Sequence, residues 1–331
     1  MSAAPIKESN VWTGDDFAEG ESWIHELSPA MIDEIAAAMR RALAEGRGEF
    51  APENFPLPET QVLLGAAYDE IENGRGFSVL RGWPVDDYSY EENVAAFRGI
   101  GAHIGEAVVQ NYEGERLVDV IDKDVEYSHR SRGYMSNKLL PFHSDGADLV
   151  GLLCLGTAAK GGSNLLVSAT RLYNTVLEEK PEYMETLLTG FYHHRRGQHD
   201  PGEDPLSPEP IPVFAFYGGY LHCCYNRNPI DWVEKEGMTL SDHEVEVLDY
   251  FDGLLQRPGM ALSMQFRRGD MQFVNNFVLL HSRTEYRDDA GHKRHLVRLW
   301  LEDPKSKRNG KGLLDLYVPG SSRFETAQQA E

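Results

Sequence analysis

The stretch Phe142-His143-Ser144-Asp145-Gly146 comes shortly before the apolar run 149–155. Because side chains on a strand alternate between its two faces, His143 and Asp145 are expected to point the same way. The apolar run predicts a buried strand directly after them, which places the pair at the edge of a sheet, facing a cavity. Together, the imidazole and the carboxylate could bind one metal ion.

His281 is the candidate for a third ligand. It lies 138 residues after His143 and follows the apolar run Phe277-Val278-Leu279-Leu280, which predicts a buried strand. Taken alone, His281 would be interpreted as a core histidine held by a hydrogen bond. Beside His143 and Asp145 it completes a set of two imidazoles and one carboxylate. Such a set holds non-haem Fe(II) on one face and leaves the opposite face open.

Two arginines follow on another predicted strand. Arg294 and Arg298 lie four residues apart in Arg294-His295-Leu296-Val297-Arg298-Leu299-Trp300-Leu301, and an even separation places both on one face. Guanidinium groups that face inward from an apolar strand are costly unless an anion meets them. Solvated arginines on a surface face are the alternative. We expect Arg294 to bind a carboxylate of a co-substrate, and Arg298 to reinforce it or to meet an anionic substrate.

The composition narrows the classes of partner. Of the 331 residues, 41% are hydrophobic, which is enough for a substantial core, and the formal net charge is −21. This charge repels nucleic-acid backbones and anionic membranes, so neither is an expected partner. With no signal-peptide core and no apolar run long enough to span a bilayer, a cytoplasmic location is expected. Cys154, Cys223 and Cys224 lack the spacing of a metal or redox site and are expected to be buried apolar residues.

The order of predicted elements indicates a β-rich fold with flanking helices. A first helix is expected to begin at Ser28-Pro29. Further helical patterns cover 58–73, 90–104, 169–189 and 241–256, and the last of these begins with a capping box. Short strands separated by turns are expected at 76–80, 117–121, 151–155, 165–168, 213–217, 221–225, 262–266, 271–275 and 295–301. Many short strands in one half favour a closed or sandwiched antiparallel sheet. Arg268-Gly269-Asp270 is expected to be a turn before a strand, not an adhesion motif.

The chain resembles the taurine dioxygenase (TauD/TfdA-like) family of Fe(II)- and 2-oxoglutarate-dependent oxygenases. The resemblance covers roughly residues 75–303. The matching pieces are Phe142-His143-Ser144-Asp145, Lys160-Gly161-Gly162-Ser163-Asn164, Asn275-Asn276-Phe277-Val278-Leu279-Leu280-His281-Ser282-Arg283-Thr284, and the run from Arg294 to Leu301.

This resemblance implies a fold, a set of ligands and a reaction. The fold would be a distorted double-stranded β-helix, a cupin-like jelly roll, with helices packed outside. His143, Asp145 and His281 would bind Fe(II), and Arg294 would pair with the distal carboxylate of 2-oxoglutarate. In the family a Thr or Ser commonly donates to that carboxylate two residues after the Gly-Gly pair, where this chain has Asn164. O₂ would be the oxidant, and succinate and CO₂ would be the co-products.

The resemblance also implies hydroxylation of an unactivated C–H bond of a small, amino-acid-like or anionic metabolite, and Arg298 and Arg227 favour the anionic class. Candidate substrate contacts are Tyr134, Asn137, Phe142, Tyr225 and Arg298, with Arg227 as a further cation. The alternatives are desaturation or cyclisation by the same iron chemistry, a non-catalytic small-molecule-binding jelly roll, and a redox-neutral metalloenzyme. The sequence leaves a homo-oligomer open.

Three segments are expected: an N-terminal helical region (1–74) packed on the core, a catalytic domain (75–303) and a C-terminal tail (304–331), frayed from Ser321. The segment 197–212 is rich in Pro, Gly and acidic residues and is the place where a lid is expected.

Overall fold

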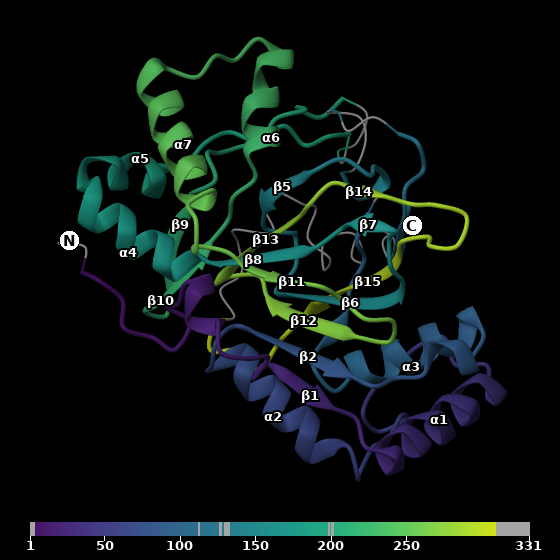
Figure 1. Ribbon diagram of the computed structural model, residues 1–331. Helices are drawn as coiled ribbons and strands as arrows, with labels where there is room; N and C mark the ends of the chain where they lie inside the picture. Colours follow the sequence, from purple (N-terminus) through teal and green to yellow (C-terminus); the bar gives the residue numbers. More distant parts are fainter. Residues whose placement is uncertain are drawn as a thin grey trace.

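Two main sheets, each covered by its own helices, make up most of the protein in the computed structural model (Figure 1). The structure describes residues 4–111, 113–125, 128, 133–197, 199 and 202–308. The fold is therefore mixed and sheet-rich, with flanking helices, as the sequence predicts. The predicted frayed tail from Ser321, like everything after 308, lies outside the described residues.

The larger sheet has seven strands. Its order is β1 (Ile24–Glu26), β2 (Phe77–Arg81), β12 (Met271–Asn275), β6 (Leu149–Gly156), β15 (His295–Glu302) and β3 (Glu106–Ala107), with β4 (Leu117–Val120) also paired to β15. All pairings are antiparallel except that of β1 with β2. The central strands β6, β12 and β15 are buried along most of their length, which explains their nearly continuous apolar sequences.

The smaller sheet carries β11 (Leu262–Met264), β8 (Asn164–Ser168), β13 (Leu279–Arg283) and β5 (Leu140–His143), in that order. Its pairings are antiparallel throughout. Two short two-stranded sheets complete the strands: β9 (Phe214–Tyr217) with β10 (Tyr220–Cys223), and β7 (Lys160–Gly161) with β14 (Tyr286–Arg287).

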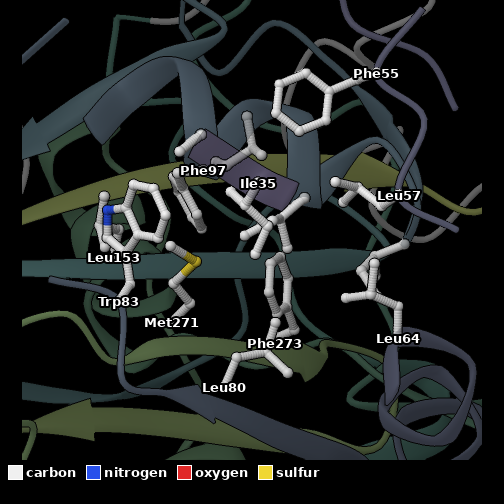
Figure 2. Close-up of a cluster of buried hydrophobic side chains, with 14 of the residues drawn as sticks. Ile35, Phe55, Leu57, Leu64, Leu80, Trp83, Phe97, Leu153, Met271 and Phe273 are labelled. Carbon is white, nitrogen blue, oxygen red and sulfur yellow. The ribbon is translucent and has the colours of Figure 1, made fainter. Parts of the chain in front are cut away.

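Three helices cover the outer face of the larger sheet: α1 (Pro29–Ala44), α2 (Gln61–Glu72) and α3 (Tyr90–Gly101). Ser28 caps α1, and Ser89 with Glu92 forms a capping box on α3. Figure 2 shows Ile35 and Leu64 from these helices in one cluster with Phe273 and Leu153 from the sheet. This core binds the N-terminal helices to β2, β6 and β12.

The remaining helices lie on the side of the smaller sheet: α4 (Ala169–Glu179), α5 (Met184–Thr189), α6 (Arg227–Asp231) and α7 (Asp242–Leu255). Their apolar residues form a second core with β8, β9 and β13. Short 3-10 helices fill the connections at Gly14–Phe17, Val85–Asp87, Gly133–Met135, Pro181–Tyr183 and Trp232–Glu236.

Several predicted boundaries need correction. The helix expected at 169–189 is broken at Lys180, because Pro181 has no N–H for helical bonding and starts a 3-10 turn instead. The helix expected from 58 begins at Gln61, since Glu59 and Thr60 donate their main-chain N–H groups to the Glu34 carboxylate, each at 2.8 Å. The strands expected to reach 225 and 266 end at Cys223 and Met264.

The Arg268-Gly269-Asp270 tripeptide forms a tight turn before β12, as predicted. Asp270 is 1% exposed, and its carboxylate accepts hydrogen bonds from Nε and Nη2 of Arg81, each at 2.8 Å. Gly269 has φ +90°, and a Cβ there would overlap the Trp83 carbonyl, so the turn requires glycine. An aspartate this buried is inaccessible to a receptor.

Two further expectations concern cysteines and membranes. Cys154, Cys223 and Cys224 are all buried free thiols, as expected. Within the described ranges, no helix combines the length and the apolar composition needed to cross a membrane.

The buried Arg81–Asp270 pair gives a stability prediction. Asp270→Ala removes the buried partner of the Arg81 guanidinium and leaves it the exposed Glu21 carboxylate, 3.1 Å from Nη1, so we expect the free energy of unfolding to fall by about 3 kcal/mol. Arg257→Ala removes a comparable two-bond pair with Glu179 whose side chains are 40% exposed, and should cost about 1 kcal/mol or less. Denaturant titration of both variants checks this, and equal losses would contradict it.

Candidate functional site

A pocket between the two sheets contains most of the residues predicted for the site. Strands β5, β8 and β13 contribute one wall, and β6 and β15 contribute the other. The described residues lining it are Val120, Tyr134, Leu140, His143, Asp145, Val150, Leu152, Asn164, His281, Ser282, Arg283, Arg294, Leu296 and Arg298. Polar and charged groups therefore gather at one place inside an otherwise apolar interior.

Strand pairing brings the two histidines together. β5 and β13 are antiparallel, and His281 lies directly opposite His143. Side chains opposite each other in such a pair share one face, and these two rings have their centroids 4.3 Å apart. The Nδ1 atom of His143 lies 2.8 Å from the Pro141 carbonyl, which can only accept. This bond fixes the tautomer, so that Nε2 presents a lone pair to the pocket.

The Asp145 side chain lies beside the two histidines, but it is not oriented by strand alternation as predicted. β5 ends at His143, so strand alternation does not orient the carboxylate. Instead Asn276 holds the main chain on both sides: its Oδ1 accepts from Asp145 N at 2.9 Å, and its Nδ2 donates to the carbonyls of Asp145 and Ala147 at 2.6 and 2.7 Å. Ser144 N donates to the Tyr225 carbonyl at 2.9 Å. The loop that carries Asp145 is thus fixed by the Asn276 side chain and by a main-chain bond to Tyr225.

The three side chains have the spacing of a metal site. Their ligand atoms all lie within 4.8 Å of one another. Asp145 Oδ1 is 3.9 Å from His143 Nε2, and Oδ2 is 3.6 Å from His281 Nε2. Two imidazole nitrogens and one carboxylate oxygen suit Fe(II), so the donor set fits the metal that the sequence predicts.

Burial and charge set the protonation states that a metal requires. Burial and the neighbouring His281 lower the pKa of His143 to about 3, so its imidazole is neutral. Burial opposes ionisation of Asp145, but the Arg298 guanidinium and His281 outweigh it and hold the pKa of that carboxyl well below its usual range. Neutral imidazole and ionised carboxylate are the forms that bind metals.

Arg298 is committed to Asp145 in this structure. Its Nη1 lies 3.0 and 3.2 Å from the two carboxylate oxygens, and its Nε donates to Gln110 Oε1 at 2.8 Å. Trp300 Nε1 also donates to Asp145 Oδ2, at 3.1 Å. Arg298 lines the pocket as predicted, and its described anionic contact is this carboxylate.

Arg294 lies just before β15 and is 6% exposed. Its Nη1 is buried and has no hydrogen-bond partner among the described residues. Gly162 has φ +75°, and a Cβ there would lie 3.2 Å from Arg294 Cδ and Nε. The Gly-Gly pair of the predicted motif therefore leaves room for the arginine. A buried cation with an unsatisfied donor is what an anionic ligand would complete.

The other predicted contacts divide into two groups. Asn164 and Tyr134 line the pocket, although Asn164 Nδ2 donates to Gln272 Oε1 at 2.7 Å. Phe142 does not, because it alternates with His143 along β5 and enters the helical core. Tyr225 is fully buried, and its hydroxyl donates to Asp252 at 2.5 Å.

Asn137 and Arg227 also lie outside the described lining of the pocket. The Asn137 carbonyl accepts from Tyr286 N, and Arg227 is paired with Asp231, Asp249 and Asp252.

Sequence reasoning missed several residues of the site. Arg283 lines the pocket two positions after His281, a period-two spacing that could have identified it. Trp300 lies two positions after Arg298 on β15 and could have been identified in the same way. Gln110 and Asn276 act through Arg298 and Asp145, and no spacing rule connects them to those residues.

The segment expected to hold a lid includes 198, 200 and 201, which lie outside the described residues. Its remaining residues pair back on the preceding segment: Arg195 N donates to the Pro205 carbonyl at 2.7 Å, and Ser207 N to that of His193 at 2.8 Å. None of its described residues lines the pocket.

Comparison with known proteins agrees with this site. Residues 40–300 match the family model described as "Taurine catabolism dioxygenase TauD, TfdA family". The chain is 34% identical over 307 residues to FR-33289 synthase of Streptomyces rubellomurinus, covering 90% of each protein. It is 30% identical over 333 residues to the taurine hydroxylase-like protein SAT17 of Stachybotrys chartarum, covering 94% of this chain and 83% of that protein.

Solved structures show the same fold. An asparagine oxygenase in complex with Fe(II), 3-hydroxyasparagine and succinate superposes with a TM-score of 0.64 at 17% identity, covering 89% of this chain and 98% of that one. The family match spans most of the chain, and the His-Asp-His arrangement lies within it. The chain thus belongs to the taurine dioxygenase (TauD/TfdA) family of Fe(II)- and 2-oxoglutarate-dependent oxygenases.

Proposed function

We propose that this dioxygenase hydroxylates an unactivated C–H bond of a small, anionic or amino-acid-like metabolite, using Fe(II), 2-oxoglutarate and O₂ and forming succinate and CO₂. One observation carries the proposal. A cluster of two histidines and an aspartate shares a buried pocket with an arginine whose Nη1 has no described hydrogen-bond partner. The cluster suits the metal, and the arginine suits the far end of a dicarboxylate.

In this proposal each residue has a defined task. His143, Asp145 and His281 hold the iron, and the metal supplies the oxidising chemistry when it is bound with 2-oxoglutarate and O₂. Arg298 and Trp300 orient the Asp145 carboxylate through the bonds they donate to it. Arg294 pairs with the distal carboxylate of 2-oxoglutarate, and Asn164 forms part of the wall beside it.

The substrate class follows from charge and from related proteins. Arg298 remains beside the pocket, and the ring of Tyr134 lies 5.1 Å from its guanidinium carbon. Leu140, Leu152 and Leu296 add apolar walls. One relative is named for taurine, a sulfonate, and one solved neighbour holds a hydroxylated amino acid. A compact substrate with one acidic group and an aliphatic carbon suits these walls.

The same family membership supports a finer account of the fold. We propose that the two facing sheets form the family's distorted double-stranded β-helix and that residues 75–303 make one catalytic domain. The helices of residues 1–74 would then serve as its outer layer, which agrees with their shared core with β6 and β12. Of the predicted tail, the described part 304–308 packs against this layer: Arg308 is 1% exposed, and its Nη1 donates to the Glu72 carbonyl at 3.0 Å.

The metal ligands can be tested by iron binding. Because changes around a metal's ligands already cost roughly 10- to 100-fold in affinity, His143→Ala and His281→Ala should lose more and purify without iron. His292→Ala, an exposed histidine in a loop, is the matched control and should bind normally. Anaerobic Fe(II) titration with a colorimetric iron assay measures this. Wild-type iron affinity in either of the first two variants would remove that histidine from the site.

The role of Arg294 can be tested by co-substrate affinity. Anaerobic addition of Fe(II) and 2-oxoglutarate should give the wild type a weak visible charge-transfer band that needs both. Arg294→Ala should weaken 2-oxoglutarate binding by roughly 30-fold or more, since losing one partner of a buried ion pair costs about 2–5 kcal/mol. Arg287→Ala, at an exposed arginine nearby, should change it little. Unchanged affinity in Arg294→Ala, with a loss in Arg298→Ala, would transfer the role to Arg298.

The substrate class can be tested by coupled turnover. Amino acids, betaines, sulfonates and aryloxy acids would be screened for succinate formation that depends on the added compound. We expect the highest rates with compounds that carry an acidic group, because Arg298 is the cation nearest the iron site. A product heavier by one oxygen identifies hydroxylation by mass spectrometry. A product lighter by two hydrogens would instead identify desaturation or cyclisation.

A further inference from the structure

Arg283 is a second buried arginine in the pocket and has no part in the site as proposed so far. It lies on β13 two residues after His281 and is 4% exposed. Its Nη2 donates to the main-chain carbonyls of Ser136, at 2.8 Å, and Lys138. Its Nε and Nη1 are buried and have no hydrogen-bond partner among the described residues.

Tyr286 adjoins both this arginine and Arg294. The centre of its ring lies 4.8 Å from the guanidinium carbon of Arg283 and 5.2 Å from that of Arg294. The Tyr286 hydroxyl is buried and, like Arg294 Nη1, lacks a hydrogen-bond partner in the described part of the chain. Four unsatisfied donor atoms therefore belong to three neighbouring side chains: Arg283 Nε and Nη1, Arg294 Nη1 and the Tyr286 hydroxyl.

This arrangement is unfavourable without a ligand. A buried donor without a hydrogen-bond partner costs free energy, because it gives up its hydrogen bonds to water and gains none in return. The two guanidinium groups also repel each other: burial and the nearby Arg294 lower the pKa of Arg283 to about 10, which still leaves it charged at neutral pH. An anion that accepts several hydrogen bonds would satisfy the donors and offset the repulsion.

We propose that Arg283 and Tyr286 bind the distal carboxylate of 2-oxoglutarate together with Arg294, an inference that rests on the proposed function. A carboxylate offers two oxygens with about four lone-pair positions, which matches the four unsatisfied donor atoms. The bonds from Arg283 to Ser136 and Lys138 then join the bound co-substrate to the loop that carries Tyr134, a wall of the substrate pocket.

The competing explanation gives Arg283 a purely structural task. Its Nη2 bonds already hold the 136–138 loop, and an arginine used only for that purpose would affect every ligand of the pocket alike. The two explanations differ in whether the effect depends on the distal carboxylate. Comparing 2-oxoglutarate with 2-oxopentanoate, which has a methyl group in place of that carboxylate, separates them.

The experiment measures both ligands against Fe(II)-loaded protein under anaerobic conditions, by calorimetry and by the charge-transfer band. Arg283→Met removes the guanidinium, and Tyr286→Phe removes only a hydroxyl while leaving the loop bonds intact. We expect 2-oxoglutarate binding to weaken roughly ten-fold or more in Arg283→Met and several-fold in Tyr286→Phe. Binding of 2-oxopentanoate should stay within about two-fold of wild type in both, as should both ligands in the exposed control Arg287→Met.

Other results overturn the inference. Equal weakening of both ligands in Arg283→Met, with no selective loss in Tyr286→Phe, would show that Arg283 only holds the loop. Unchanged 2-oxoglutarate affinity in both variants would remove both residues from the co-substrate site while leaving the proposed function intact. A wild-type protein that binds iron but shows no 2-oxoglutarate complex would overturn the proposed function and this inference with it.

Discussion

The pairing of β5 with β13 places His281 opposite His143, and the arrangement of the pocket depends on this register. β13 is fixed from its other side by five paired positions with β8, and its own residues Leu279 and Leu280 are fully buried. A shift of one residue would turn His281 to the opposite face and carry Arg283 away with it. Core packing therefore sets the position of the candidate metal ligands.

The charge of the pocket is opposite in sign to the net charge of the whole protein. The chain carries a formal charge of −21, yet Arg283, Arg294 and Arg298 meet inside with Asp145 as the only acidic residue among the described lining. Burial makes each of these charges more effective than a surface charge, because water screens it less. A small anion can thus be attracted locally by a protein whose surface repels larger polyanions.

Much of the site could be predicted because its chemistry restricts the residue types. Two histidines, one aspartate and an arginine were identified from their chemistry, context and family resemblance, and the structure brings all four to one pocket. The reason given for Asp145 was wrong, since Asn276 holds it beyond the end of β5. That bond joins residues 131 positions apart, a distance over which local periodicity carries no information.

The predicted substrate contacts come together only in part, again for a physical reason. Tyr134 lines the pocket, whereas the side chains of Phe142 and Tyr225 lie in the helical core. Whether a side chain faces a pocket depends on where a strand ends, as β5 does at His143. The predicted strands were mostly correct to within one or two residues, and that error is enough to change the face on which a side chain lies.

The bond from Trp300 to Asp145 has an experimental consequence. The chain has five tryptophans, and Trp300 donates its indole N–H directly to the candidate metal-binding carboxylate. The Arg298 guanidinium carbon lies 4.7 Å from the centre of its ring, so two charged groups of the pocket adjoin the same chromophore. Its fluorescence is therefore sensitive to any redistribution of charge at that carboxylate, which gives the apo protein a built-in optical probe that needs no added label.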